Sequence, residues 1–249
     1  MRQATRDRQS GLTLVETLVG IAVIAIISVS IYQGFIAILR VFELTKIKVA
    51  AVDLANEQIE LIRNMPYASV GTIGGVPPGV LPATAVVTRD NIPFAVTTTV
   101  RNIDDPFDGT IGGVPSDLSP ADYKIVEIAL SCTGCQTPQT FTFTNTVAPK
   151  SLETSSSNGA LFIQVINESG VAVSGATVQV TNAKVSPAVN VTDATDANGF
   201  LKLVDVPPST QSYHVVVSKS GYSGDQTYAT STQNPNPTEP DATVALQTV

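Results

Sequence analysis

The sequence predicts an α+β protein in which a long N-terminal helix packs on an antiparallel sheet and a small all-β sandwich follows. Three observations predict this fold class. An apolar run without charged residues extends between Glu16 and Arg40, and the pattern then becomes amphipathic up to Pro66. The rest of the chain consists of short alternating runs separated by Gly-, Pro- and Asn-rich turns, which is typical of strands.

Composition limits the functions that we expect. The chain has 249 residues, of which 43% are hydrophobic and 14% are charged, and its net charge is −7. An acidic chain whose basic residues gather only near the N-terminus is not expected to bind nucleic acid. The single histidine and two cysteines leave little material for a catalytic site. We therefore expect no enzyme activity, no catalytic residues and no cofactor.

The apolar run is long enough to form a membrane span. A bilayer core of about 30 Å requires about 20 apolar residues in a helix. Arg2, Arg6 and Arg8 precede the run, so we expect a short cytoplasmic N-terminus, with the rest of the chain on the other side. Glu16 needs an explanation, because a carboxylate at the bilayer centre costs about 2.5 kcal/mol or more, although less near the interface.

Three simpler explanations of this segment compete. A secretory signal peptide has an apolar core of about 7–15 residues and a small-residue cleavage site. Ser28-Val29-Ser30 has the composition of such a site, but the apolar run continues to Leu39. A lipoprotein signal is excluded because no cysteine follows the apolar core. A plain signal anchor stays open, but it leaves Glu16 unexplained.

The segment Gly11-Leu12-Thr13-Leu14-Val15-Glu16, followed by the apolar run, resembles the processing motif of type IV prepilins and pseudopilins. The resemblance implies that prepilin peptidase removes the leader, residues 1–11, by cutting between Gly11 and Leu12, and that Leu12 becomes N-methylated. Leu12 stands where Phe is commonest in the family. The resemblance also makes Glu16 an assembly residue that pairs with the terminal ammonium of a neighbouring subunit. Such a pair at about 4 Å could contribute about 4 kcal/mol at an effective dielectric constant of about 20.

The pilin-like domain is expected at residues 12–150. Its helix covers about 12–64, and after Arg40 its apolar residues recur at a spacing of three to four. Its sheet covers about 83–148 and contains four strand-like runs. The pilin resemblance independently implies a helix packed on an antiparallel sheet.

The heptapeptide GTIGGVP occurs twice, at residues 71–77 and 109–115. Nothing around the two copies matches, so we interpret them as two similar Gly-rich loops and not as a repeat architecture.

Two further motifs lie in this domain. Cys132 and Cys135 could serve redox chemistry or form half a zinc site, but in an oxidising compartment we favour a disulfide that closes a hairpin turn. Asp104, Asp105 and Asp108 are weak candidates for calcium ligands. They lack the spacing of a recognised calcium loop, so we favour a solvated turn and expect no metal site.

A polar linker at residues 151–158 precedes the second domain, at 159–249, where short alternating runs predict a sandwich. Three of its segments resemble the carboxypeptidase-regulatory-like, transthyretin-like sandwich; they are Gly175–Val180, Thr195–Gly199 and Tyr213–Val217. The resemblance implies a non-catalytic domain. His214 lies in a predicted strand and is interpreted as structural.

These observations predict a subunit of a type IV pilus-like filament, specifically a minor or tip pilin that carries an accessory binding domain. Its partners would be other pilin subunits, prepilin peptidase and, before assembly, the cytoplasmic membrane. We expect a single-pass membrane protein that then enters an extracellular filament or a periplasmic pseudopilus. Two alternatives stay open: a type II secretion pseudopilin, and a membrane-anchored surface binding protein that never polymerises.

Overall fold

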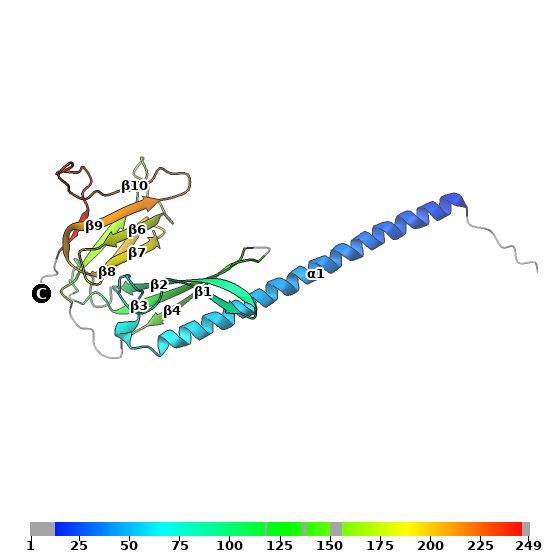
Figure 1. Ribbon diagram of the computed structural model, residues 1–249, viewed down its shortest axis with the longest axis horizontal. Helices are drawn as coiled ribbons and strands as arrows, with labels where there is room; N and C mark the ends of the chain where they lie inside the picture. The colour runs from blue at the N-terminus through cyan, green and yellow to red at the C-terminus, as the bar shows by residue number, and fades with distance from the viewer. Residues whose placement is uncertain (1–12, 118, 136–137, 150–155, 246–249) are drawn as a thin grey trace, which may run out of the picture. The chain divides into compact units, whose positions relative to one another are not determined.

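A computed structural model describes residues 13–117, 119–135, 138–149 and 156–245. It confirms the α+β class, because one long helix is followed by antiparallel sheets (Figure 1). The chain divides into two compact units, Met1–Val49 and Ala50–Val249. The bond between Gly11 and Leu12, where processing was expected, lies outside the described residues.

The first unit consists of the N-terminal part of helix α1 (Leu14–Arg63). The helix starts at Thr13, whose Oγ1 accepts a hydrogen bond from the backbone N–H of Glu16 at 3.3 Å. A Thr followed three residues later by Glu is the sequence of a capping box, which satisfies backbone donors that the first turn leaves free. The helix is long and apolar enough to cross a membrane.

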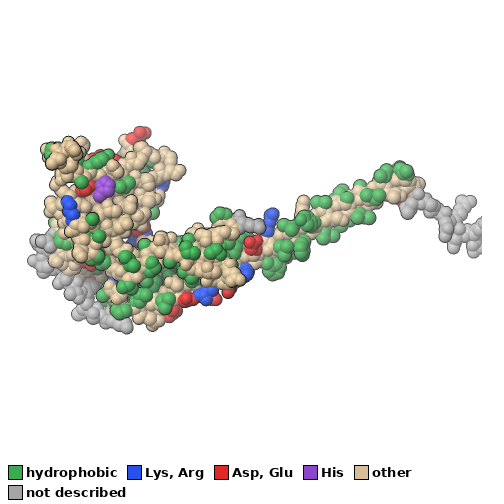
Figure 2. Space-filling view, viewed as in Figure 1, with side chains coloured by type: hydrophobic (Ala, Val, Ile, Leu, Met, Phe, Trp, Pro, Cys, Tyr) green, Lys and Arg blue, Asp and Glu red, His purple; other side chains and the backbone are tan. Residues whose placement is uncertain are grey.

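Large apolar side chains are exposed along most of this first unit, as Figure 2 shows, including Leu14, Ile24, Ile31 and Phe42. A helix that is apolar on all sides needs an apolar environment, since so large an exposed apolar surface is rare on a soluble monomer. This part of α1 is therefore suited to a membrane.

In the second unit, α1 continues with an apolar stripe on one side. Its buried residues recur at the spacing of a helix face; they are Ala50, Ala51, Leu54, Ala55 and Ile62. Glu57 of the helix forms an ion pair with Arg89 of the first strand. Pro66 follows the helix and precedes a 3-10 turn, η1 (Tyr67–Ser69).

Four strands form the antiparallel head sheet: β1 (Thr84–Arg89), β2 (Ile92–Ile103), β3 (Tyr123–Cys132) and β4 (Thr140–Val147). Asp90 and Asn91 join β1 to β2 with φ of 51° and 62°, the positive values that a tight hairpin turn requires. One face of the central strands is buried; it carries Phe94, Val96, Val100, Val126, Ile128 and Leu130.

Seven strands form the C-terminal sandwich: β5 (Gly159–Gln164), β6 (Thr177–Asn182), β7 (Val189–Ala194), β8 (Phe200–Val206), β9 (Ser209–Ser218), β10 (Asp225–Gln226) and β11 (Ala242–Val244). One sheet has the order β10-β9-β6-β7, with β11 also paired to β9, and β5 pairs with β8 in the other. A single apolar core contains residues of both sheets, among them Leu161, Val180, Leu203 and Tyr213. This shared core makes the two sheets a sandwich.

Two turns in this region follow one chemical pattern. The side-chain oxygen of Asn167 accepts hydrogen bonds from the backbone N–H groups of Ser169 and Val171, and that of Asp196 accepts from those of Asn198 and Phe200. Each turn ends in a glycine with positive φ. Asn and Asp therefore start these turns because their side chains replace backbone acceptors.

Candidate functional site

Glu16 is the candidate assembly residue, and it is exposed in the first turn of α1. A carboxylate is favourable there because the helix dipole places partial positive charge at the N-terminus. No charged residue follows until Arg40, so Glu16 is an isolated anion at the start of a long apolar surface. In an apolar environment such a group gains most from a cation supplied by a partner.

Cys132 and Cys135 are joined by a disulfide at the end of β3. Gly134, between them, has a φ of 97°, which favours glycine. A bridge that closes so short a loop removes little chain entropy from the unfolded state. Its effect is local stiffening of the chain between the two cysteines.

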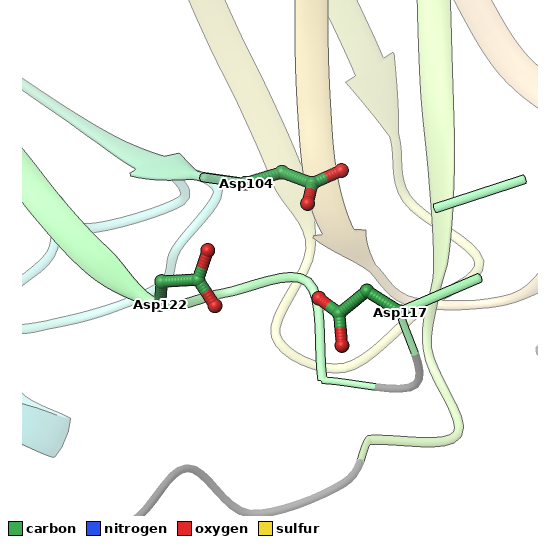
Figure 3. A group of neighbouring side chains, drawn as sticks. All are labelled: Asp104, Asp117 and Asp122. Carbon is green, nitrogen blue, oxygen red and sulfur yellow. The ribbon is translucent and has the colours of Figure 1, made fainter. Parts of the chain in front are cut away.

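Three carboxylates gather beyond the ends of β2 and β3, as Figure 3 shows: those of Asp104, Asp117 and Asp122. One oxygen from each lies within 4.8 Å of the others. Asp105 and Asp108, the other two weak candidates, are not in this group. The backbone N–H of Asp105 instead donates to Asp122 Oδ2 at 2.5 Å, and Asp108 is exposed.

The environment of this carboxylate cluster raises the pKa of Asp104. Partial burial is the main cause, and the negative charges of Asp117 and Asp108 add to it, whereas a hydrogen bond from the backbone N–H of Ile111 opposes it. A set of carboxylate oxygens is the donor chemistry that Ca²⁺ prefers. The cluster could therefore hold a hard cation.

The same oxygens also hold the loop between β2 and β3. Asp104 Oδ2 accepts from the Ile111 N–H at 2.9 Å, and Asp117 Oδ1 accepts from the Ser119 N–H at 2.8 Å. Sequence reasoning missed Asp117 and Asp122 because neither lies near Asp104 along the chain. The signal that could have found them is topological, since both ends of a loop between paired strands lie close together.

A cavity of about 640 Å³ lies between the head sheet and the sandwich. Its lining mixes aromatic, charged and amide side chains, including Asn102, Asp104, Thr110, Phe162, Phe200 and Lys202. Asn102 Oδ1 is buried and has no hydrogen-bond partner among the described residues. Apolar walls with a few convergent polar groups are typical of small-molecule sites, so this cavity is a candidate binding site.

His214 has partners that the sequence did not reveal. Its Nδ1 lies 3.1 Å from Asp241 Oδ1, and Thr227 Oγ1 donates to the same oxygen at 2.8 Å. These contacts connect β9 with the segment before β11. The arrangement supports a structural role for the histidine.

Comparison with known proteins bears on the N-terminal segment. Residues 6–32 match the family model of the prokaryotic N-terminal methylation motif. No curated protein and no solved structure matches the chain. The matched range includes the Gly11–Leu12 bond, Glu16 and much of the apolar run, so the match supports a type IV pilin- or pseudopilin-like protein. Such a protein is held in the membrane by one helix, processed by prepilin peptidase and assembled with other pilins.

Proposed function

We propose that this chain is a structural subunit of a type IV pilus-like filament and that its role is that of a minor or tip pilin with an accessory binding domain. The observation that carries the proposal is the position of Glu16. It is exposed in the first turn of a helix whose following apolar surface is also exposed, and it lies inside the matched methylation motif.

The same helix is surrounded by lipid in the membrane and by other helices in the filament. In the membrane, lipid covers the apolar surface, but the Glu16 carboxylate has no counter-charge from its own helix before Arg40. Cleavage after Gly11 would create an ammonium on Leu12 of each subunit. In a filament the apolar surfaces cover one another, and this ammonium pairs with Glu16 of a neighbour. Assembly thus stabilises a charge that the membrane does not.

The C-terminal sandwich supports the finer part of the proposal. Its shared core and two sheets are consistent with the resemblance to carboxypeptidase-regulatory-like domains, which are non-catalytic. A head sheet with an added sandwich is bulky for a filament built from this subunit alone. The cavity beside Phe162 and Lys202 offers a binding surface, as a displayed accessory domain requires.

Replacing Glu16 tests the proposal. Glu16→Ala should leave processing and membrane insertion intact but remove the chain from filaments sheared from cells. Glu43→Ala is the matched control, since Glu43 is an exposed glutamate farther along the same helix. Unchanged filament incorporation of Glu16→Ala would contradict the proposal. Processed wild-type chain that never leaves the cell on shearing would instead favour a type II secretion pseudopilin.

A further inference from the structure

The two GTIGGVP segments form the same central turn. In the first loop (71–77), the Gly75 N–H donates to the Thr72 carbonyl at 2.9 Å, and in the second loop (109–115) the equivalent bond is 2.8 Å. The glycine before each of these donors has nearly the same φ, +73° and +72°. The central turn is thus the same in two surroundings, although the first glycine differs, since Gly109 has a φ of 134° and Gly71 has no positive φ. The identical residues specify this turn.

The surroundings of the two loops differ completely. Val76 of the first loop is only 4% exposed and belongs to the core of the C-terminal sandwich. Its counterpart Val114 is 103% exposed, and Phe107, just before the second loop, is 97% exposed. One copy of the loop is therefore inserted in a core, and the other presents the same valine to solvent.

The first loop also completes an open strand edge. Strand β7 is at the end of its sheet, and the backbone N–H of Asn190 on β7 donates to the carbonyl of Gly74 at 2.6 Å. An unpaired edge N–H is a docking point for another backbone, and here the loop occupies it. We use the name socket for two features together: the Asn190 N–H and the core position that Val76 fills.

We propose that the second loop is an intermolecular copy of the first, which inserts Val114 into the socket of another copy of this chain. The first loop in its socket is a direct template for this contact, because the inserted sequence is identical. The second loop carries the same residues, so it can form the same backbone hydrogen bond and the same valine contacts in a socket that the first loop of that chain has left. The inference goes beyond the proposed filament role, because it does not use the helix or Glu16.

Introduced cysteines can detect this contact. A Cβ on Gly74 would lie 3.8 Å from the Cβ of Asn190, the usual separation in a disulfide. Gly74→Cys with Asn190→Cys should therefore lock the first loop within one chain, which calibrates the method. The chain's two native cysteines are already joined, so the introduced thiols are the only free ones.

The test places the two cysteines on different full-length chains, mixed in detergent micelles. One chain carries Gly112→Cys, at the position equivalent to Gly74, and the other carries Asn190→Cys. A second mixture adds Val76→Asp to the Asn190→Cys chain, which expels that chain's own loop from its socket. If Val76→Asp prevents folding, the first mixture remains the test.

We expect a disulfide-linked pair of twice the chain's mass under oxidising conditions, with more of it when Val76→Asp vacates the socket. Adding Val114→Asp to the Gly112→Cys chain should abolish the pair, because a charge cannot enter the core. The inference is overturned if neither mixture yields the pair while the calibration chain locks. A pair that persists with Val114→Asp also overturns it, because the link would then arise from random collision.

Discussion

Arg101 of β2 and Asp193 of β7 form a bidentate ion pair, with Nε–Oδ2 and Nη2–Oδ1 distances of 2.5 Å. The pair joins the head sheet to the sandwich across 92 residues of sequence. The Asp193 side chain is only 7% exposed. The hydrogen bonds and charge of Asp193 raise the pKa of Arg101. A nearly buried carboxylate thus depends on a guanidinium from another sheet.

Replacing Arg101 should therefore destabilise the folded protein. Arg101→Leu leaves the Asp193 carboxylate buried without its counter-charge, so we expect the free energy of unfolding to fall by about 3–5 kcal/mol. The double variant Arg101→Leu/Asp193→Leu should recover much of this loss, because no buried charge remains. Urea unfolding of the four chains of this double-mutant cycle measures the coupling.

An exposed pair on the same protein is the control. Arg63 and Glu60 are paired at 2.7 Å, but both side chains are more than half exposed, so Arg63→Leu should cost at most about 1 kcal/mol. Equal effects of Arg63→Leu and Arg101→Leu would show that the Arg101–Asp193 pair does not hold the two sheets together.

Lys124 gives a prediction for alkaline pH. Its Nζ is buried and donates to the carbonyls of Tyr67 and Val70 at 2.9 and 2.6 Å, and desolvation lowers its pKa from 10.5. Between the lowered pKa and 10.5 the unfolded chain binds more protons at this site than the folded chain does. The contribution of Lys124 to stability should therefore rise with pH across that interval.

Lys124→Met tests this prediction. The variant leaves the buried Val70 carbonyl without its donor, whereas the Tyr67 carbonyl keeps a hydrogen bond from the Val70 N–H, so it should lose about 1–3 kcal/mol of stability at neutral pH. The difference in melting temperature between wild type and variant should widen as pH rises toward 10.5. A difference that stays constant over this range would show that the desolvation argument is wrong.

The contribution of Asp104 to stability changes with pH in the opposite direction, and it does so at acid pH. Because its pKa is raised above 3.8, the folded chain holds the Asp104 proton at pH values where the unfolded chain has lost it. Stability due to this group is thus present below pH 3.8 and is lost as pH rises through the folded pKa. Asp104→Asn removes the charge but keeps an oxygen for the Ile111 N–H. We expect the variant to melt at a higher temperature than wild type at neutral pH, and at the same temperature below pH 3.8.

Thermal melts of both chains across this pH range, with a chelator present, provide the measurement. Asp108→Asn is the control, since Asp108 is exposed and only adds its charge to the effect on Asp104. A lower melting temperature for Asp104→Asn at neutral pH would mean that the carboxylate stabilises the loop more than its burial costs.

The fold was predictable where local patterns determine it. Periodicity indicated α1, and alternation indicated the head-sheet strands, because a helix face and a pleated strand each impose their own spacing on buried residues. Strand β7 is not evident from the sequence, since its short run VNVTDA alternates between two valines and polar residues that also suit a loop. Its pairing with β6 supplies the stability that the local pattern does not reveal.

The features that the sequence did not predict arise from contacts between distant segments. Val76 in the sandwich core, the Arg101–Asp193 pair and the group formed by Asp104, Asp117 and Asp122 each join residues that no local rule connects. The GTIGGVP repeat was visible in the sequence, but only the structure shows that one copy is inserted and the other exposed. By contrast, Glu16 was a candidate from sequence alone, because a charge inside an apolar run is anomalous wherever the chain folds.

We propose that the chain is processed after Gly11 and exported into filaments. Mass spectrometry of the N-terminus, comparing the membrane fraction with material sheared from cells, tests it most directly. We expect the sheared chain to begin with N-methylated Leu12. Chains that retain Met1 in both fractions would contradict it and would leave a signal-anchored surface protein.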